Sequence, residues 1–227
     1  MAQKNIDSEI PSALLHRLPR YYRALRQLIA GDILRVRSTE LARLLGTGAS
    51  QIRQDLHYFG EFGQKGYGYN VKDLYSRMGE LLGVNRNYSV AIWGENGSGI
   101  MLAGFPVLKQ RGVCVRFVAD SVAAPRDFAY PVIREEELAE RCASNGIDIV
   151  VFCVGRDRLE ERLRILEELR PAGVWNLTEH AFSLSGVTVH ELCPADDFMA
   201  LCCDIYQKQK SEVSAVEAAL EPKKRND

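Results

Sequence analysis

The stretch STELARLLGTGASQIRQDLHYFGEFGQKGYGY, residues 38–69, decides the fold of the N-terminal part of the chain. Its first half has apolar residues at helical spacing on both sides of Gly46-Thr47-Gly48, which predicts two short helices joined by a glycine-containing turn. Its second half alternates glycines with aromatic residues and predicts a tight hairpin with Lys65 at the tip. A helix-turn-helix followed by such a hairpin is the pattern of a winged-helix domain.

The second of these helices has more polar side chains than a packed helix can hide. Ile52, Leu56 and Phe59 are expected to face the core, so the other positions face outward. These positions are Gln51, Arg53, Gln54, His57 and Tyr58. A helix in the major groove of DNA needs donors such as Gln and Arg near its N-terminal end. The pattern favours DNA binding, with an ordinary solvated helix as the alternative.

Further helices are expected on both sides of this module. Residues 11–30 have apolar side chains at helical spacing, and we expect Pro19 to kink or restart that helix and Gly31 to end it. Residues 71–82 predict a closing helix, and residues 83–87 have the composition of a linker.

The rest of the chain alternates strand-like runs with amphipathic helices. Continuous Val- and Ile-rich runs separated by helices are typical of a parallel sheet covered on both faces, which is a doubly wound, Rossmann-like α/β architecture. The expected strands are 89–93, 113–120, 147–154, 174–177 and 187–190. The expected helices are 98–111, 135–144 and 158–170, followed by an amphipathic segment at 196–220.

The turn after the first of these strands reads GENGSG, residues 94–99. A dinucleotide-binding turn has the pattern G-x-G-x-x-G, which Gly94 and Gly99 satisfy. Asn96 stands in place of the second glycine, where we expect its side chain to crowd the pyrophosphate. Asp120 ends the next strand, as expected of an acidic residue that holds the adenosine ribose. These features favour a nucleotide site, with a tight turn that binds nothing as the alternative.

The charges of the 227-residue chain divide unevenly, although their sum is −1. Residues 1–83 carry 12 Lys and Arg against 8 Asp and Glu, whereas residues 84–227 carry 17 against 22. This division favours a basic module joined to an acidic one. The chain lacks any apolar run of about 20 residues, which excludes a transmembrane helix. The polar N-terminus and six cysteines without zinc spacing favour a cytoplasmic protein with no metal site.

Several of these segments resemble the redox-sensing transcriptional repressors called Rex. The resemblance rests on RLPRYYR (17–23), IRQDLHYFGEFGQKGYGY (52–69) and the order of winged helix, Rossmann domain and C-terminal helix, and it covers about residues 9–206. It implies a homodimeric repressor, not an enzyme, that binds palindromic operators in double-stranded DNA when NADH is low and releases them when NADH binds. The implied domains are 1–83 (winged helix), 84–194 (Rossmann-like, NAD(H)-binding) and 195–227 (a helix swapped between subunits and a disordered tail).

The resemblance also assigns residues to each function. DNA contacts fall on Ser50, Gln51, Arg53, Gln54, Tyr58, Lys65 and Tyr69. Cofactor contacts fall on Gly94, Asn96, Gly97, Ser98, Gly99 and Asp120. Arg23 matches an arginine linked to the redox switch of the family, and Phe105 stands where the family has a tyrosine that takes part in switching.

Two alternatives remain at this stage. Asn96 and Phe105 depart from the family at the ligand site, so the chain could be a repressor that has lost NADH sensing and answers another ligand or none. Tyr206 and Lys210 have the Tyr-x-x-x-Lys spacing of a small NAD-dependent oxidoreductase. The apolar face of the last helix favours the swapped dimer, because it is too large for a free terminal helix. That face consists of Phe198, Met199, Leu201, Cys202 and Ile205.

Overall fold

The computed structural model describes residues 10–59, 63–64, 67–109 and 112–220. The chain forms two compact units, Met1–Asn87 and Tyr88–Asp227, which we describe separately.

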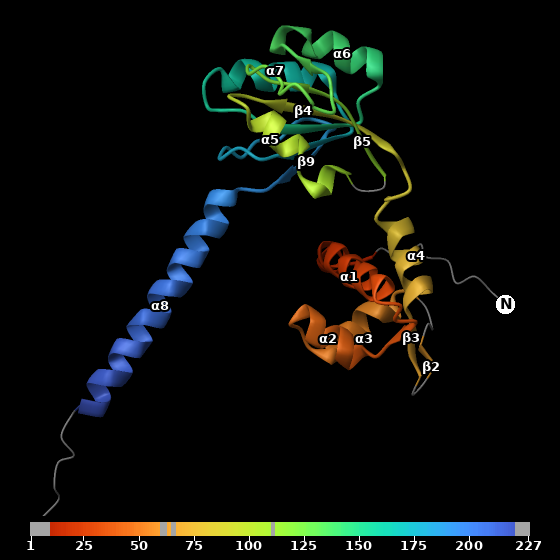
Figure 1. Cartoon of the computed structure of the whole chain (residues 1–227), viewed down its shortest axis with the longest axis vertical. Coiled ribbons are helices and arrows are strands. Elements are labelled where there is room, and N and C mark those ends of the chain that lie inside the picture. The colour runs from red at the N-terminus through yellow and green to blue at the C-terminus, as the bar shows by residue number, and fades with distance from the viewer. Residues whose placement is uncertain (1–9, 60–62, 65–66, 110–111, 221–227) are drawn as a thin grey trace, which may run out of the picture. The chain divides into compact units, whose positions relative to one another are not determined.

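The first unit is a winged helix-turn-helix, as the sequence predicts. Its helices are α1 (Ser12–Ala30), α2 (Ser38–Leu45), α3 (Ala49–His57) and α4 (Val71–Leu81). Its small antiparallel sheet has the order β1-β3-β2, formed by β1 (Arg35–Val36), β2 (Gly63–Gln64) and β3 (Gly68–Asn70). The two strands of the wing, β2 and β3, follow directly after the second helix of the helix-turn-helix (Figure 1).

The core of this unit comes from all four helices. Leu18, Leu25, Ile52, Leu74 and Met78 are completely buried, and most of the apolar positions read from the helical spacing lie with them. Burying such side chains contributes about 1.5–3 kcal/mol each before conformational entropy is subtracted.

The structure corrects part of one local expectation in this unit. The helix does not restart at Pro19, because α1 continues through that residue and ends before Gly31 as expected. α2 begins after Arg37, whose backbone N–H donates to the Glu40 carboxylate at 2.7 Å. This bond satisfies an N–H that the start of the helix leaves without a partner.

The second unit is built on a six-stranded sheet in which every strand pair is parallel. The sheet has the order β6-β5-β4-β7-β8-β9. Its strands are β4 (Tyr88–Gly94), β5 (Val113–Ala119), β6 (Val132–Ile133), β7 (Ile149–Cys153), β8 (Gly173–Asn176) and β9 (Thr188–Glu191). Numbered in order of appearance this is 3-2-1-4-5-6, the strand order of a Rossmann fold. The expected doubly wound architecture is therefore confirmed.

Helices cover both faces of this sheet (Figure 1). On one face, α6 (Leu138–Asn145) and α7 (Leu159–Leu169) bury Leu138 and Leu166 against Trp93 and Phe152. On the other face, α5 (Ser98–Ala103) buries Leu102 against the sheet. Both faces of the central strands are thus apolar, which explains the uninterrupted Val/Ile runs in the sequence.

Two predictions of elements were wrong in this unit. The helix expected at 98–111 ends at Ala103, and a 3-10 turn, η1 (Pro106–Lys109), follows it. Pro106 accounts for this break, because proline disfavours the helical conformation of the residue before it. The short strand β6 was not predicted, since two residues carry too little pattern to read.

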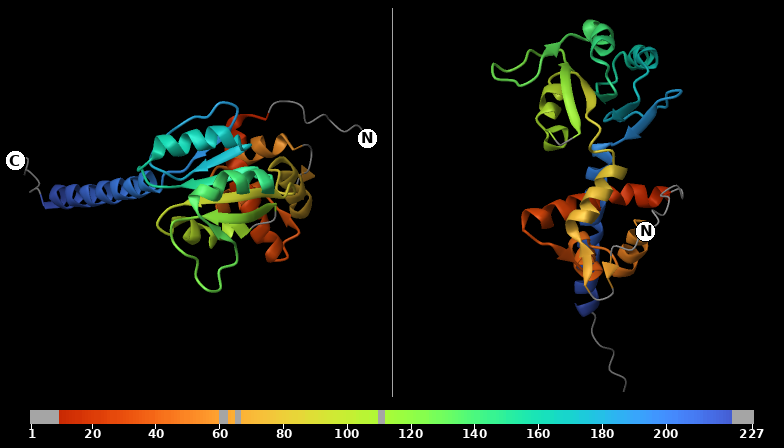
Figure 2. Two further views of the ribbon diagram at one scale, coloured as in Figure 1. Left: turned by 90° about the horizontal axis from the view of Figure 1, so that it is seen from above. Right: turned by 90° about the vertical axis from the view of Figure 1, so that its right-hand side faces the viewer.

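The unit ends in α8 (Pro194–Leu220), one continuous helix (Figure 2). Its side chains from residue 196 to residue 213 are all exposed, including the apolar face of the expected dimer helix. Within the described part of the chain, no helix is both long and apolar enough to cross a membrane.

Candidate functional site

The outward face of α3 forms the first candidate site. Ser50, Arg53, Gln54 and Tyr58 are exposed on it, as the sequence predicts. They line a hollow of about 600 Å³ in the first unit, together with residues at the start of α1 and on the inner edge of α3. The other residues that line it are Pro11, Leu14, Arg17, Gln51, Asp55 and His57. A wall of hydroxyl, amide and guanidinium groups on one helix suits the donors and acceptors of base edges.

A buried carboxylate at the inner edge of this hollow fixes α3 to α1. The Asp55 side chain is only 3% exposed and accepts two hydrogen bonds from Arg17, from Nε at 2.8 Å and from Nη2 at 2.7 Å. The hydroxyl of Tyr21 also donates to Asp55, and Gln51 Nε2 donates at 2.9 Å. A bidentate guanidinium–carboxylate pair defines both distance and orientation, so it positions the helix that carries the exposed polar face.

The electrostatics of this cluster follow from its burial. Burial by itself would raise the pKa of Asp55, but the hydrogen bonds from Arg17 and Tyr21 outweigh it and hold that pKa below the usual range. Burial and the hydrogen bond to Asp55 raise the pKa of Tyr21 to about 12. Asp55 therefore stays ionised and Tyr21 stays protonated at neutral pH.

Asp55 was missed in the sequence, although a signal for it exists. It shares its helix face with Ile52, Leu56 and Phe59, because positions 52, 55, 56 and 59 follow the helical repeat of a buried stripe. A carboxylate in such a stripe requires a partner.

The remaining predicted DNA contacts lie in different surroundings. Gln51 is half-buried with its amide nitrogen on Asp55, and Tyr69 on β3 is half-buried against the core. The Nη1 atom of Arg53 lies 3.5 Å from the hydroxyl oxygen of Ser38. Lys65 lies outside the described residues. Arg23, predicted for the redox switch, is exposed on α1.

The glycine turn between β4 and α5 forms the second candidate site. A Cβ on Gly94 would lie 2.2 Å from the Gly99 nitrogen, and a Cβ on Gly99 would lie 2.9 Å from Val118 Cγ1. These positions therefore exclude side chains, because strand and helix approach each other too closely. Asn96 and Gly97 both have positive φ, 54° and 87°. Asparagine tolerates this conformation better than most residues, and Asn96 is exposed rather than packed inside the turn.

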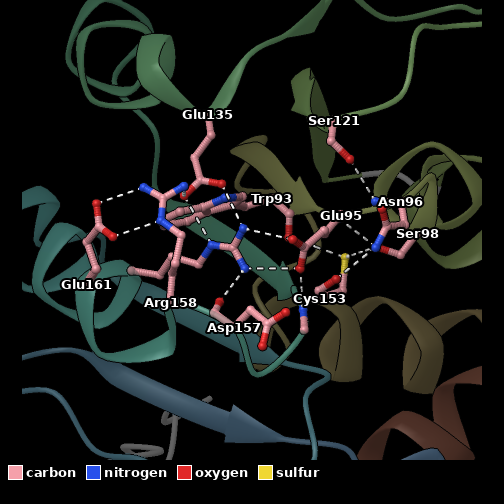
Figure 3. A network of polar contacts seen from close by, with 12 residues as sticks. Trp93, Glu95, Asn96, Ser98, Ser121, Glu135, Cys153, Asp157, Arg158 and Glu161 are labelled. Atoms are coloured by element: carbon pink, nitrogen blue, oxygen red, sulfur yellow. Dashed lines mark hydrogen bonds and ion pairs between the residues drawn. The ribbon is translucent and has the colours of Figure 1, made fainter.

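Asp120, at the end of β5, closes this turn. Its buried carboxylate accepts from the N–H of Gly97 at 2.9 Å and of Gly99 at 3.0 Å, as well as from Val122. The N–H of Asn96 donates to the Ser121 hydroxyl at 3.0 Å (Figure 3). The acidic residue expected at the ribose thus also satisfies backbone groups of the turn.

Ser98 and Cys153 connect the turn to the neighbouring strand. The Ser98 hydroxyl accepts from the N–H of Glu95 at 2.9 Å and donates to the Cys153 carbonyl at 2.8 Å. The Cys153 thiol donates to the Trp93 carbonyl at 3.3 Å, and burial raises its pKa to about 11 (Figure 3). Ser98 is therefore a structural link between β4 and β7, whatever else it contacts.

An ionic network that sequence reasoning missed lies beside the turn. Arg162 on α7 has a side chain only 4% exposed, and it pairs with Glu95 at 3.1 Å and Glu135 at 2.8 Å. The Glu95 carboxylate also accepts from the N–H of Gly155 at 2.9 Å. These hydrogen bonds hold the pKa of Glu95 below its usual value. Sequence separation hid the network, because Glu95 and Arg162 are 67 residues apart.

The residues present fit a dinucleotide at this sheet edge. The cradle of Gly94 and Gly99 has the close approach that such a turn needs, and Asp120 lies at the end of the neighbouring strand. Phe105, predicted for the switch, is 43% exposed just before η1. Among the described residues, no three His, Cys, Asp or Glu side chains gather in a way that could hold a metal ion.

Comparisons with known proteins identify relatives among DNA-binding proteins. Residues 9–57 match a family model described as a putative DNA-binding protein N-terminus. The redox-sensing transcriptional repressor Rex of Clostridium perfringens is 39% identical over 172 residues, which cover 74% of this chain and 80% of that protein.

Two solved structures of RSP, a Rex-family repressor, share the fold. The RSP complex with β-NADH has a TM-score of 0.78 at 26% identity and covers 91% of this chain and 98% of RSP. The RSP complex with β-NAD⁺ and operator DNA has a TM-score of 0.77 at 26% identity and covers 95% and 100%.

Proposed function

This chain belongs to the Rex family of redox-sensing transcriptional repressors, and from that premise we propose that it represses transcription by binding operator DNA under the control of NAD(H). The observation that carries the proposal is the construction of α3. One face of this helix is exposed and polar, and the helix is fixed to α1 through the buried Asp55.

For the DNA side, we propose contacts from Ser50, Gln51, Arg53, Gln54, Tyr58, Lys65 and Tyr69. Arg53 and Gln54 are exposed on α3 and have the donors that read base edges in the major groove. The amide nitrogen of Gln51 donates to Asp55, so we propose that Gln51 contributes through its side-chain carbonyl or by orienting the helix. Lys65, which comes between β2 and β3 in the sequence, would contact phosphate and add little base preference.

For the ligand side, we propose that NAD(H) binds across the carboxyl edge of the sheet. The cradle of Gly94 and Gly99 would admit the pyrophosphate, with Asn96, Gly97 and Ser98 completing the turn, and Asp120 would hold the adenosine ribose. NAD(H) would supply the redox signal itself, since its oxidised and reduced forms differ in charge at the nicotinamide. We place Arg23 and Phe105 in the conformational switch, with NADH releasing the DNA.

We propose that the active form is a homodimer joined through α8. Its exposed apolar side chains support this, because Phe198, Met199, Leu201 and Ile205 would otherwise remain in contact with water. The functional segments would be 1–83, 84–194 and 195–227, acting in the cytoplasm, where the operator is. A dimer reads a palindrome because its two-fold axis coincides with that of the operator.

We do not assign an enzymatic activity to the chain. Its Rex relatives are named as transcriptional repressors. Tyr206 and Lys210 lie on α8, where both are exposed. A turnover of NADH with carbonyl substrates that is lost in Tyr206→Phe would contradict this part of the proposal.

Selection of DNA from a random pool, with and without NADH, tests the proposed function. We expect palindromic sequences to be recovered and NADH to reduce the recovery. Arg53→Ala should relax the base preference, whereas Lys65→Ala should weaken binding to all sequences alike and reduce its salt dependence. Recovery of no preferred sequence by the dimer would overturn the DNA side, and recovery unaffected by millimolar NADH would overturn the ligand side.

A further inference from the structure

The strand order places a particular carboxylate where a nucleotide is expected to lie. In an open parallel sheet, ligands bind outside the carboxyl ends of the strands, at the point where the strand order reverses. Here that point lies between β4 and β7. The strands that follow β4 along the chain, β5 and β6, extend to one side, and those that follow β7, β8 and β9, extend to the other. Gly94, at the end of β4, pairs with Cys153, at the end of β7.

Glu95 spans this switch point. It follows directly after β4, and its Oε2 accepts from the backbone N–H of Gly155, which lies two residues beyond the end of β7, at 2.9 Å. The same oxygen lies 3.1 Å from Arg162 Nη1, and Oε1 lies 3.2 Å from Nη2 (Figure 3 shows the surrounding network). A Cβ on Gly155 would approach Glu95 Oε2 to 3.0 Å, so the carboxylate lies tightly against the loop.

The donors that Glu95 occupies are the kind that bind phosphate. A backbone N–H at the end of a strand and a guanidinium group are recurrent partners of phosphate oxygens. Arg162 is not free to serve a ligand as well, because its other contacts go to Glu135 and to the carbonyl of Asp157 at 3.0 Å. An incoming diphosphate would therefore meet a negative charge and satisfied donors.

We propose that Glu95 is an internal competitor for anionic ligands at the switch point, so that it sets the affinity of this chain for NAD(H) and other diphosphate nucleotides. The inference rests on the proposed function, whose ligand it concerns. Binding requires Glu95 to leave Gly155 and Arg162 or to tolerate a phosphate beside it. Glu95 thus keeps the affinity low and confines occupancy to high ligand concentrations.

The group of charged side chains around Glu95 presents a net negative charge to an anionic ligand. Arg162 is shared by two carboxylates, Glu95 and Glu135. A second guanidinium, that of Arg158, also lowers the pKa of Glu95, but it pairs with Glu161 at 2.7 Å and lies 3.8 Å from Glu135. These three carboxylates and two guanidinium groups carry a net charge of −1. Removal of Glu95 makes the group neutral and leaves Arg162 paired with Glu135.

Calorimetric titration of the full-length dimer with NADH tests this proposal through Glu95→Ala and Glu95→Gln. We expect Glu95→Ala to bind NADH about tenfold more tightly than the natural chain, the effect of removing one like charge several ångströms from a phosphate. Glu95→Gln should fall between them, because its amide oxygen still accepts from Gly155. Glu168→Gln is the matched control, since it removes the same charge from an exposed position of α7 outside this group of charges, and it should change the affinity less than about twofold.

The outcomes separate the inference from the function on which it rests. Tighter binding by both Glu95 variants supports the inference, even if the natural chain binds NADH too weakly to measure. Unchanged or weaker binding by both variants, beside measurable binding by the natural chain, overturns the inference and leaves the proposed function standing. Absence of NADH binding in the natural chain and in both folded variants overturns the inference together with the NAD(H) part of the function. Thermal unfolding of each variant establishes that it is folded, and Glu95→Gln retains the side-chain shape if Glu95→Ala does not fold.

Discussion

Removal of the Asp55 carboxylate should destabilise the first unit and leave the second unchanged. Asp55 accepts hydrogen bonds from Arg17, Tyr21 and Gln51 and is 3% exposed. Loss of one member of a buried ion pair costs about 3–5 kcal/mol. The Arg17 side chain is 34% exposed and can regain water, so we take the lower end, about 3 kcal/mol, for Asp55→Ala. Asp55→Asn, which keeps the shape and one acceptor, should cost about 1–2 kcal/mol.

The two tryptophans of the chain make the assay selective. Trp93 and Trp175 both lie in the second unit, so their fluorescence reports on that unit alone, whereas far-ultraviolet circular dichroism follows the helices of both units. In urea, we expect the circular-dichroism transition of Asp55→Ala to gain an early component, shifted by about 2 M at a typical m-value. The tryptophan transition should remain at its natural midpoint.

The control for Asp55→Ala is a variant of an exposed carboxylate in the same unit. Glu80→Ala removes an exposed carboxylate from α4 and should shift the transition by less than about 0.5 kcal/mol. An Asp55→Ala transition that coincides with that of Glu80→Ala would refute the anchoring of α3 through Asp55. If Asp55 anchors α3 to α1, the operator affinity of Asp55→Asn should also fall below that of the natural chain. This is measured without urea, where the first unit of the variant is still folded.

Three further predictions concern other groups. The pKa of Tyr21 is raised above its unfolded value near 10, so the stability that Tyr21 contributes is complete below pH 10 and is lost as pH rises toward 12. The loss is about 2–3 kcal/mol, and Tyr21→Phe should flatten this part of the pH–stability curve. An identical curve for the variant would contradict this prediction. Gly94→Ala places a Cβ 2.2 Å from the nitrogen of Gly99 and should cost more than about 4 kcal/mol, seen as early loss of tryptophan fluorescence; a natural midpoint would disprove the close approach. Cys203 is exposed and lies outside the apolar face proposed for the dimer, so it should be alkylated by iodoacetamide at pH 8. Cys153, with a pKa raised to about 11, should react only on unfolding, as mass spectrometry of the peptides would show. Equal rates would count against the burial of Cys153.

Much of the fold could be predicted from local pattern. The polar outer face of α3 follows from the spacing of Ile52, Leu56 and Phe59, and the parallel sheet follows from uninterrupted apolar strands between helices. Each pattern extends over one element and repeats with the period of that element, so neighbouring residues contain it in full. Pro106 is also a local signal, because proline disfavours a helical conformation of the residue before it.

The candidate sites could be predicted only in part. Gly94, Gly99 and Asp120 lie together as expected, because the turn and the next strand follow each other in a fixed topology. The hydrogen bonds from the turn to Asp120, by contrast, depend on the register of β5 against β4, which decides whether the Asp120 carboxylate reaches the N–H groups of Gly97 and Gly99.

By itself the sequence determined the kind of most elements, the order of the two units and the faces that they bury. Only the tertiary structure decided the partners of the buried charges. Arg17 and Asp55 are 38 residues apart, and Glu95 and Arg162 are 67 residues apart. The physical reason is that periodicity records whether a side chain is buried, whereas an ion pair requires two particular atoms within about 3 Å. Packing of whole elements brings such atoms together, and no local pattern encodes that packing.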